Sequence, residues 1–206
     1  MVVLLVVINR YDYMCGFVLW ITGLSGSGKT TLAKSIIEIL KANNYKTMHL
    51  DGDQLREILL QPKDQSSKYD HETRRNLAFT YAKLAKFLSK DNFIVVVSTI
   101  SLYNDLHDWN RSNIDNYFEV YLDVPLQKLK ERDVKGIYAK YKSGTINQIA
   151  GLDLDVEFPK NPDHVIEYDG KLSAKDSATQ LFKVISPLLK NQWTTTATPN
   201  QVTSQV

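Results

Sequence analysis

Short apolar runs alternate along this chain with longer segments in which apolar residues recur every three or four positions. Continuous apolar runs are typical of strands buried on both faces of a parallel sheet, and the wider spacing is typical of helices with one buried face. Such runs predict strands at residues 17–21, 93–97 and 118–122, and two more mixed segments, 46–50 and 165–168, are predicted as further strands of the same alternating pattern. The spacing predicts helices at residues 32–40, 72–90 and 174–190, and Pro125 suits the first turn of another.

Each of the three longer predicted helices has one apolar face. These faces carry Leu32, Ile36, Ile39 and Leu40 in the first helix, Leu77, Tyr81, Leu84 and Leu88 in the second, and Ala178, Leu181, Phe182, Ile185 and Leu189 in the last. Strands that alternate with such helices form an α/β fold, a parallel sheet covered by helices on both faces. No repeat or linker divides the sequence, so we expect one domain over residues 14–192.

The two ends of the chain differ from this central part. Residues 1–13 begin with an apolar, largely β-branched run that lacks the leading positive charge and small-residue cleavage site of a secretory signal. We interpret them as an N-terminal extension, either a short extra strand or a mobile arm, with Met14 as an alternative start. Residues 193–206 are polar with little to bury, and we expect them to form a disordered tail.

Composition argues against several classes of protein. The 206 residues are 43% hydrophobic and carry a formal net charge of +2, and no long Lys/Arg block is present, so we expect no nucleic-acid partner. No apolar run approaches the roughly 18 residues of a membrane-spanning helix, so we expect no membrane partner. Cys15 is the one cysteine and cannot form an internal disulfide. Nothing therefore demands an oxidising compartment, and we expect a cytoplasmic location.

The stretch Gly23-Leu24-Ser25-Gly26-Ser27-Gly28-Lys29-Thr30 matches the phosphate-binding pattern G-x-x-x-x-G-K-[ST] at every position. It lies between a predicted strand and a predicted helix, which is the order that the motif requires. Inward-facing backbone N–H groups and the helix N-terminus favour an anion, so the loop predicts an ATP site in a sheet of the P-loop NTPase type. Lys29 is expected to reach the β- and γ-phosphates, and the Thr30 hydroxyl is expected to bind Mg²⁺.

A second cluster follows strand 46–50 and consists of Asp51, Asp53 and Arg56. Ligands of parallel sheets bind at the carboxyl ends of the strands, where this cluster, the phosphate loop and residues 98–101 are expected to meet. A carboxylate can accept the proton of a substrate hydroxyl or hold Mg²⁺ through water, and an arginine can grip an anionic group. The alternative is a turn whose charges are only solvated.

A third cluster, Arg132-Asp133-Val134-Lys135-Gly136-Ile137-Tyr138, leads into a strand-poor, glycine-punctuated stretch that ends at Pro162. A long stretch of this kind inside a compact domain is usually a lid or a binding loop. Arg132 and Lys135 are expected to close over the ATP phosphates and to offset developing charge. The alternative is a basic helix end exposed to solvent.

Together these strings resemble the adenylylsulfate kinase family over about residues 17–190. The matching segments are 23–31, 51–56, 98–101, 121–125 and 132–138, followed by Gly151 and Asn161-Pro162. Segments 51–56 and 132–138 are far more specific than the phosphate loop, which many kinases share. The resemblance implies transfer of the ATP γ-phosphate to the ribose 3′-hydroxyl of a nucleotide acceptor. It also implies Mg²⁺, a mobile lid and a homodimer.

The resemblance also assigns residues to the site. Asp51 becomes the candidate base or metal-side carboxylate, Arg56 and Arg74 are expected to grip the acceptor's phosphate-linked group, and Tyr69 stands where the family has a stacking Phe. The expected catalytic residues are Lys29, Asp51 and Asp53, and the expected metal ligands are Thr30 and Asp51. The expected ATP contacts are Gly23, Ser25, Gly26, Ser27, Gly28, Lys29, Thr30, Thr31, Arg132 and Lys135. The expected acceptor contacts are Asp53, Arg56, Tyr69, Arg74, Ile100, Ser101, Lys135 and Ile149.

Three departures from the family pattern fall in the acceptor half. Leu77 stands where the family has an Asn, although Asn76 is adjacent, and Ile-Ser-Pro-Tyr-Arg of the family reads Ile-Ser-Leu-Tyr-Asn at residues 100–104. Ile149 aligns with a second Phe that sandwiches the adenine. Stacking on one aromatic face is worth about 1–3 kcal/mol per base. These departures indicate a changed acceptor preference, unless the changes are neutral and Arg111 supplies the missing cation.

Three functions therefore stay open at this stage. An adenylylsulfate kinase-like activity leads, because the specific strings belong to that family. A similar kinase of polysaccharide modification acts on cytidine diphosphoramidate, and its smaller pyrimidine suits Ile149 in place of Phe. The third is a nucleotide-binding regulatory module without turnover, and the intact Lys29, Thr30, Asp51 and Asp53 argue against it.

Overall fold

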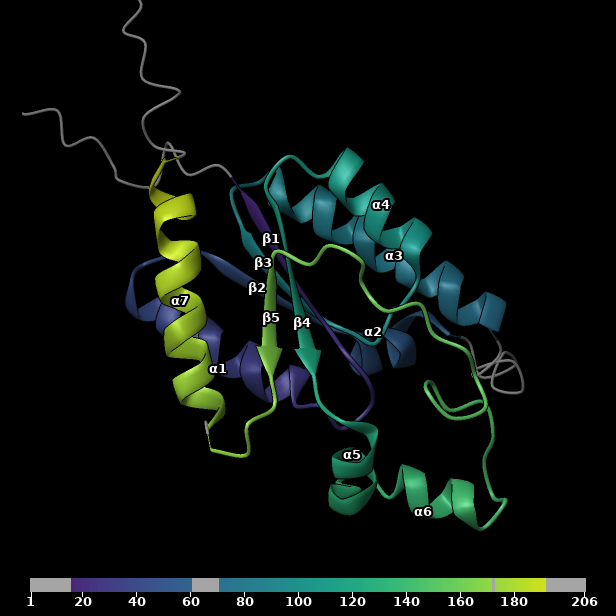
Figure 1. The fold of residues 1–206 in the computed structure, drawn as a ribbon. Helices are drawn as coiled ribbons and strands as arrows, with labels where there is room; N and C mark the ends of the chain where they lie inside the picture. Colours follow the sequence, from purple (N-terminus) through teal and green to yellow (C-terminus); the bar gives the residue numbers. More distant parts are fainter. Residues whose placement is uncertain (1–15, 61–70, 172, 192–206) are drawn as a thin grey trace, which may run out of the picture.

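A computed structural model describes residues 16–60, 71–171 and 173–191 (Figure 1). Within these residues, five parallel strands form one sheet in the order β2-β3-β1-β4-β5. The strands are β1 (Phe17–Thr22), β2 (Thr47–Asp51), β3 (Ile94–Ser98), β4 (Tyr117–Asp123) and β5 (His164–Glu167). The α/β class and the predicted strands are confirmed, with bounds that differ by a single residue at most.

Helices cover both faces of the sheet (Figure 1). On one face lie α1 (Lys29–Ala42) and α7 (Ala174–Asn191), and on the other lie α3 (His71–Ser89) and α4 (Asn104–Asn113). The remaining helices are α2 (Gly52–Leu59), α5 (Leu126–Arg132) and α6 (Ile137–Lys142). The sequence patterns did not predict α2, α4 or α6, because these segments are short or carry too few apolar residues to show a helical spacing.

Burial on both faces explains the continuous apolar run of β1. Leu19 and Ile21 pack in the core beneath α1 and α7, whereas Val18 and Trp20 pack in the core beneath α3 and α4. All four side chains are completely buried. Because neighbouring residues of a strand point to opposite faces, a strand at the centre of such a sheet needs an apolar residue at every position.

A third apolar cluster lies beyond the carboxyl ends of the strands. It joins Leu24 of the phosphate loop to Leu129 of α5, Tyr138 of α6 and Ile149. The Tyr138 hydroxyl also donates a buried hydrogen bond of 3.0 Å to the backbone oxygen of Ser25. The stretch predicted as a lid is therefore packed directly against the phosphate loop at its start.

Several sequence predictions concern residues outside the described part of the chain. They are the N-terminal extension at residues 1–13, the tail at residues 193–206 and the stacking side chain Tyr69. Among the described residues, no helix combines the length and the apolar character needed to cross a membrane.

Candidate active site

Left-handed backbone conformations shape the phosphate loop between β1 and α1. The φ angles of Gly23, Gly26 and Gly28 are 148°, 79° and 99°, a region that side chains rarely adopt. At Gly23 space is limiting as well, because a Cβ would lie 2.8 Å from the backbone oxygen of Leu122 in β4. The loop therefore curls tightly over the N-terminus of α1, where an anion is favoured.

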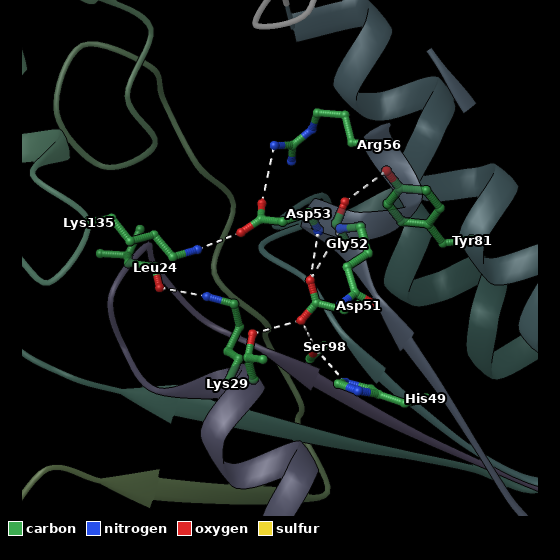
Figure 2. A network of polar contacts seen from close by, with 12 residues as sticks. Leu24, Lys29, His49, Asp51, Gly52, Asp53, Arg56, Tyr81, Ser98 and Lys135 are labelled. Carbon is green, nitrogen blue, oxygen red and sulfur yellow. Dashed lines mark hydrogen bonds and ion pairs between the residues drawn. The ribbon is translucent and has the colours of Figure 1, made fainter. Parts of the chain in front are cut away.

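Lys29 is a buried cation at the start of α1, with 9% of its surface exposed. Its Nζ donates a hydrogen bond of 2.7 Å to the backbone oxygen of Leu24 (Figure 2). Burial, and then the charge of Lys135, lower the pKa of Lys29 to about 7 against the opposing pull of Asp53 and Asp51. A bound phosphate supplies the negative charge that favours the protonated form, so the site is suited to an anionic ligand.

Asp51 ends β2 and caps the N-terminus of α2 with its side chain. Its Oδ1 accepts from the backbone N–H groups of Asp53 at 3.0 Å and Gln54 at 3.4 Å, and its Oδ2 accepts from the hydroxyls of Thr30 at 2.7 Å and Ser98 at 2.9 Å. Burial raises the pKa of Asp51, but these hydrogen bonds outweigh it and hold the pKa below its ordinary value. Both carboxylate oxygens are thus occupied by donors.

Asp53 is the more exposed carboxylate of the pair, with 53% of its side chain accessible. Lys135 reaches across from the lid stretch and places its Nζ 2.5 Å from Asp53 Oδ2, while Arg56 donates to Oδ1 at 3.2 Å (Figure 2). Burial raises the pKa of Asp53, and Lys135 followed by Arg56 lowers it below its ordinary value. A cation from the stretch predicted as a lid is therefore paired with a carboxylate that lines the same pocket.

A cleft of about 510 Å³ connects these groups, a volume suited to a nucleotide-sized ligand. The predicted residues that line it are Ser25, Gly26, Gly28, Lys29, Thr30, Thr31, Asp51, Asp53, Arg56, Arg74, Ile100, Lys135 and Ile149. A smaller cavity of about 40 Å³ is lined by Arg56, Arg74, Ile100 and Ser101. It is also lined by Leu77, one of the residues that differ from the family pattern. Residues from distant parts of the chain thus meet at the carboxyl ends of β1, β2 and β3, as the parallel sheet predicted.

The three departures can be followed in this geometry. Leu77 is buried and lines the small cavity, whereas Asn76 is exposed and does not replace the missing amide there. Asn104 begins α4, and its backbone N–H donates to Glu157 Oε2 at 2.7 Å. Ile149 lines the cleft as a buried aliphatic side chain.

The structure contradicts the suggestion that Arg111 supplies a cation to the acceptor site. Its guanidinium pairs with buried Glu119 at 3.1 Å and with Asp163 at 3.1 Å, and it donates to the backbone oxygen of Asn161 at 2.6 Å. Arg111 lies on α4, two residues before its end, and none of these partners lines the cleft. Its position on the helix instead places its guanidinium beside the buried carboxylate of Glu119 in β4.

Arg132 also lies outside the set of cleft-lining residues. Its guanidinium sits over the ring of Tyr168, 4.3 Å from the ring centre. Cations are attracted to aromatic faces at such distances. Of the two cations assigned to the phosphates, Lys135 reaches the cleft and Arg132 does not.

Ser98 belongs to residues 98–101, which were expected at this edge of the sheet, whereas two further contributors to the site, Tyr81 and His49, were missed by the sequence interpretation. Ser98 donates to Asp51, Tyr81 donates to the backbone oxygen of Gly52 at 3.3 Å, and His49 contacts Ser98. Residues two apart on a strand share a face, so the spacing of His49 and Asp51 was a signal. Tyr81 matched only a helical core position, and nothing in the pattern distinguished its hydroxyl.

Comparison with known proteins agrees with this geometry. The model of the family described as adenylylsulphate kinase matches residues 15–167. A cytidine diphosphoramidate kinase from Campylobacter jejuni is 39% identical over 144 residues, which cover 70% of this chain and 82% of the relative. An adenylyl-sulfate kinase from Rippkaea orientalis is 36% identical over 174 residues, which cover 84% of this chain and 93% of the relative.

Among solved structures, the Mycobacterium tuberculosis APS kinase CysC in complex with AMPPNP and APS superimposes with a TM-score of 0.75. It is 29% identical, and the match covers 84% of this chain and 99% of that chain. The sheet and the helices on its faces therefore have the same arrangement as in this solved structure.

Proposed function

The chain belongs to the adenylylsulphate kinase family, and from that premise we propose that it is a phosphotransferase that moves the γ-phosphate of ATP to the ribose 3′-hydroxyl of a nucleotide acceptor. The observation that supports this most directly is that Lys29, Thr30 and Asp51 line the same cleft as Arg56 and Arg74. The first group suits a triphosphate, and the two arginines suit the anionic part of an acceptor.

The donor atoms around Thr30 fit Mg²⁺. The Thr30 hydroxyl and the Asp51 carboxylate are hard oxygen ligands, which this ion prefers. In the part of the chain that the structure describes, no group of three or more His, Cys, Asp or Glu side chains is arranged around a metal position. That agrees with an ion held by few protein ligands, since Mg²⁺ in kinases is bound largely by water and substrate phosphates. When bound, it would neutralise charge on the phosphates.

The chain's own residues then divide the work. Asp51, with both oxygens occupied, holds Thr30 and serves the metal side. Asp53 is accessible and lies beside Arg56, so we assign it to orient the acceptor hydroxyl and accept its proton as the new O–P bond forms and the bond to ADP breaks. Lys29 stabilises charge on the transferred phosphoryl group, and Lys135 turns from Asp53 to the phosphates.

Two acceptors remain candidates for this cleft. Most relatives named above are adenylyl-sulfate kinases, which favours adenylylsulfate and a place in sulfate assimilation. Two observations favour cytidine diphosphoramidate and a place in capsule polysaccharide modification. The chain is 39% identical in sequence to the cytidine diphosphoramidate kinase, and aliphatic side chains, Ile149 and Leu77, line the pockets that Arg56 and Arg74 also line. The proposal includes a cytoplasmic location and a homodimer.

The deciding experiment measures ADP release with adenylylsulfate, with cytidine diphosphoramidate and with neither. Phosphorus NMR of the product then identifies the phosphorylated hydroxyl. We expect turnover with one acceptor, a 3′-phosphorylated product and no turnover in Lys29→Ala. Absence of acceptor-dependent ADP release with both nucleotides would contradict the proposal and favour a regulatory nucleotide-binding module. Sedimentation of the same preparation tests the homodimer.

A further inference from the structure

A line of three side chains runs from the edge of the sheet to the candidate active site. His49 and Asp51 lie two residues apart in β2, so their side chains share one face of the sheet. Ser98 is the register partner of Asp51 in β3. His49 Nε2 lies 3.0 Å from Ser98 Oγ, and Ser98 Oγ lies 2.9 Å from Asp51 Oδ2 (Figure 2).

Elementary hydrogen-bond chemistry fixes the direction of both contacts. An ionised carboxylate can only accept, so the one proton of the Ser98 hydroxyl goes to Asp51. With that proton committed, the Ser98 oxygen can only accept from the imidazole, and His49 Nε2 must carry a hydrogen. This holds for the neutral ring and for the charged ring alike, so the arrangement does not depend on titration of His49.

We propose that His49 is a positioning residue that acts on Asp51 through Ser98. Without a donor at His49, the Ser98 hydroxyl is free to rotate away from Asp51 Oδ2. The same oxygen accepts from Thr30 at 2.7 Å, so a shift of the carboxylate is passed to the phosphate loop. The inference rests on the function proposed above, because it assigns His49 a part in that phosphoryl transfer.

Single and double variants test the route through Ser98. We expect His49→Leu and Ser98→Ala each to lower kcat about tenfold, roughly the value of one hydrogen bond, with little change in the acceptor KM. His49→Gln restores most of the activity, because its amide can donate at a similar reach. In the Ser98→Ala background, His49→Leu has no further effect.

The matched control is His164→Leu, another half-buried histidine on the opposite edge strand β5, which leaves kcat unchanged. If His49→Leu lowers kcat equally in the parent and in the Ser98→Ala background, the inference is overturned. So would a His49→Gln enzyme as slow as His49→Leu, since packing rather than donation would then explain both. Thermal melting of each variant checks that the fold is retained.

A measurement without turnover separates this inference from the proposed function. Long-range ¹H–¹⁵N spectra of the ligand-free protein report which imidazole nitrogen carries hydrogen, and the His49 signal is the one missing in His49→Gln. We expect a protonated Nε2 in the parent. A bare Nε2 overturns the role of His49 whatever the activity, whereas a parent with protonated Nε2 that phosphorylates neither acceptor overturns the proposed function and with it the catalytic part of this inference.

Discussion

Thr30 on α1 donates a hydrogen bond of 2.7 Å to Asp51 at the end of β2, although strand β3 lies between β2 and the strand that leads to Thr30. The bond joins the phosphate loop to the acidic cluster. Because Thr30 spends its proton on Asp51, the lone pairs of its oxygen stay available for a cation. The two halves of the site are thus coupled through one hydroxyl.

Replacing Thr30 by Val removes this hydroxyl and keeps the shape of the side chain. We expect kcat/KM for ATP to fall by about a hundredfold or more, since a donor to Asp51 and a ligand for Mg²⁺ are lost together. Steady-state kinetics at saturating acceptor measures the effect. Thr179→Val, an exposed threonine on α7, is the control and leaves the constants unchanged. A loss no larger in Thr30→Val than in the control would contradict the assignment.

Asp53→Asn tests which carboxylate serves the acceptor. If Asp53 accepts the proton, kcat falls by about 10²–10⁴ while ATP binding, followed by calorimetry, changes little. The same substitution weakens the contact of Lys135 in the ligand-free protein. Hydrogen exchange of α6 should therefore quicken, and Glu131→Gln, which disturbs only exposed contacts with Lys128 and Gln127, should leave it unaltered. Retained turnover would return the role to Asp51.

Much of this site could be predicted because its residues follow strand ends. The alternation of strand-like and helix-like segments located β1, β2 and β3, and a parallel sheet brings their carboxyl ends together, so Lys29, Asp51 and Ser101 were placed in one region. The helices α2 and α4 were missed. A capping carboxylate at the start of α2 and the few, only partly apolar turns of both helices leave no helical spacing of apolar residues to detect.

Side-chain partners were the part that sequence could not give. Arg111 was a plausible cation for the acceptor, but its helix directs it to Glu119 and Asp163, which depends on the packing of α4 over β4. Arg132 was expected at the phosphates and lies over Tyr168, a contact between segments far apart in the chain. Long flexible side chains reach several partners, and only the three-dimensional arrangement selects among them.

Arg111→Met is expected to destabilise the protein. Glu119 is 1% exposed, with His107 Nδ1 2.5 Å from Oε1 and Arg111 at Oε2, so the variant leaves a buried carboxylate without its guanidinium. Loss of one partner of a buried pair costs about 3–5 kcal/mol, and the partial exposure of Arg111 reduces this to about 2 kcal/mol.

Urea unfolding of the ligand-free protein measures the loss. Arg75→Met, which breaks the exposed pair with Asp105, is the control and should cost less than about 1 kcal/mol. Adding Glu119→Leu to Arg111→Met should recover stability, because the buried carboxylate that lost its guanidinium is then removed as well. Equal costs for Arg111→Met and Arg75→Met would mean that Glu119 does not depend on its guanidinium partner.

Lys29 should make the stability of the ligand-free protein depend on pH. Its pKa is about 7 when folded and 10.5 when unfolded, so between these values the unfolded state binds more protons. The contribution of Lys29 to the free energy of unfolding must then rise with pH through this window, by at most about 1.4 kcal/mol per pH unit. Below and above the window this contribution stays level.

The comparison of parent with Lys29→Met isolates this dependence from other titrating groups. In metal-free buffer the difference in unfolding free energy should change in favour of the parent from pH 7 to 10. A constant difference would mean that the buried amine keeps its ordinary pKa in the folded protein.

Ile149 is expected to take part in the choice of acceptor base. It lies in the cleft with 8% exposure, and its backbone N–H is fixed by Asp153 Oδ1 at 2.6 Å. Ile149→Phe adds an aromatic face, and stacking on such a face is worth about 1–3 kcal/mol per base. The larger purine gains more from it, so the ratio of kcat/KM for adenylylsulfate over cytidine diphosphoramidate should rise about tenfold. Ile146→Phe, in the same apolar cluster but outside the cleft, should leave the ratio unaltered. If both variants keep the parent's ratio, Ile149 does not contact the base, and the preference must arise from Leu77 and the residues around the smaller cavity.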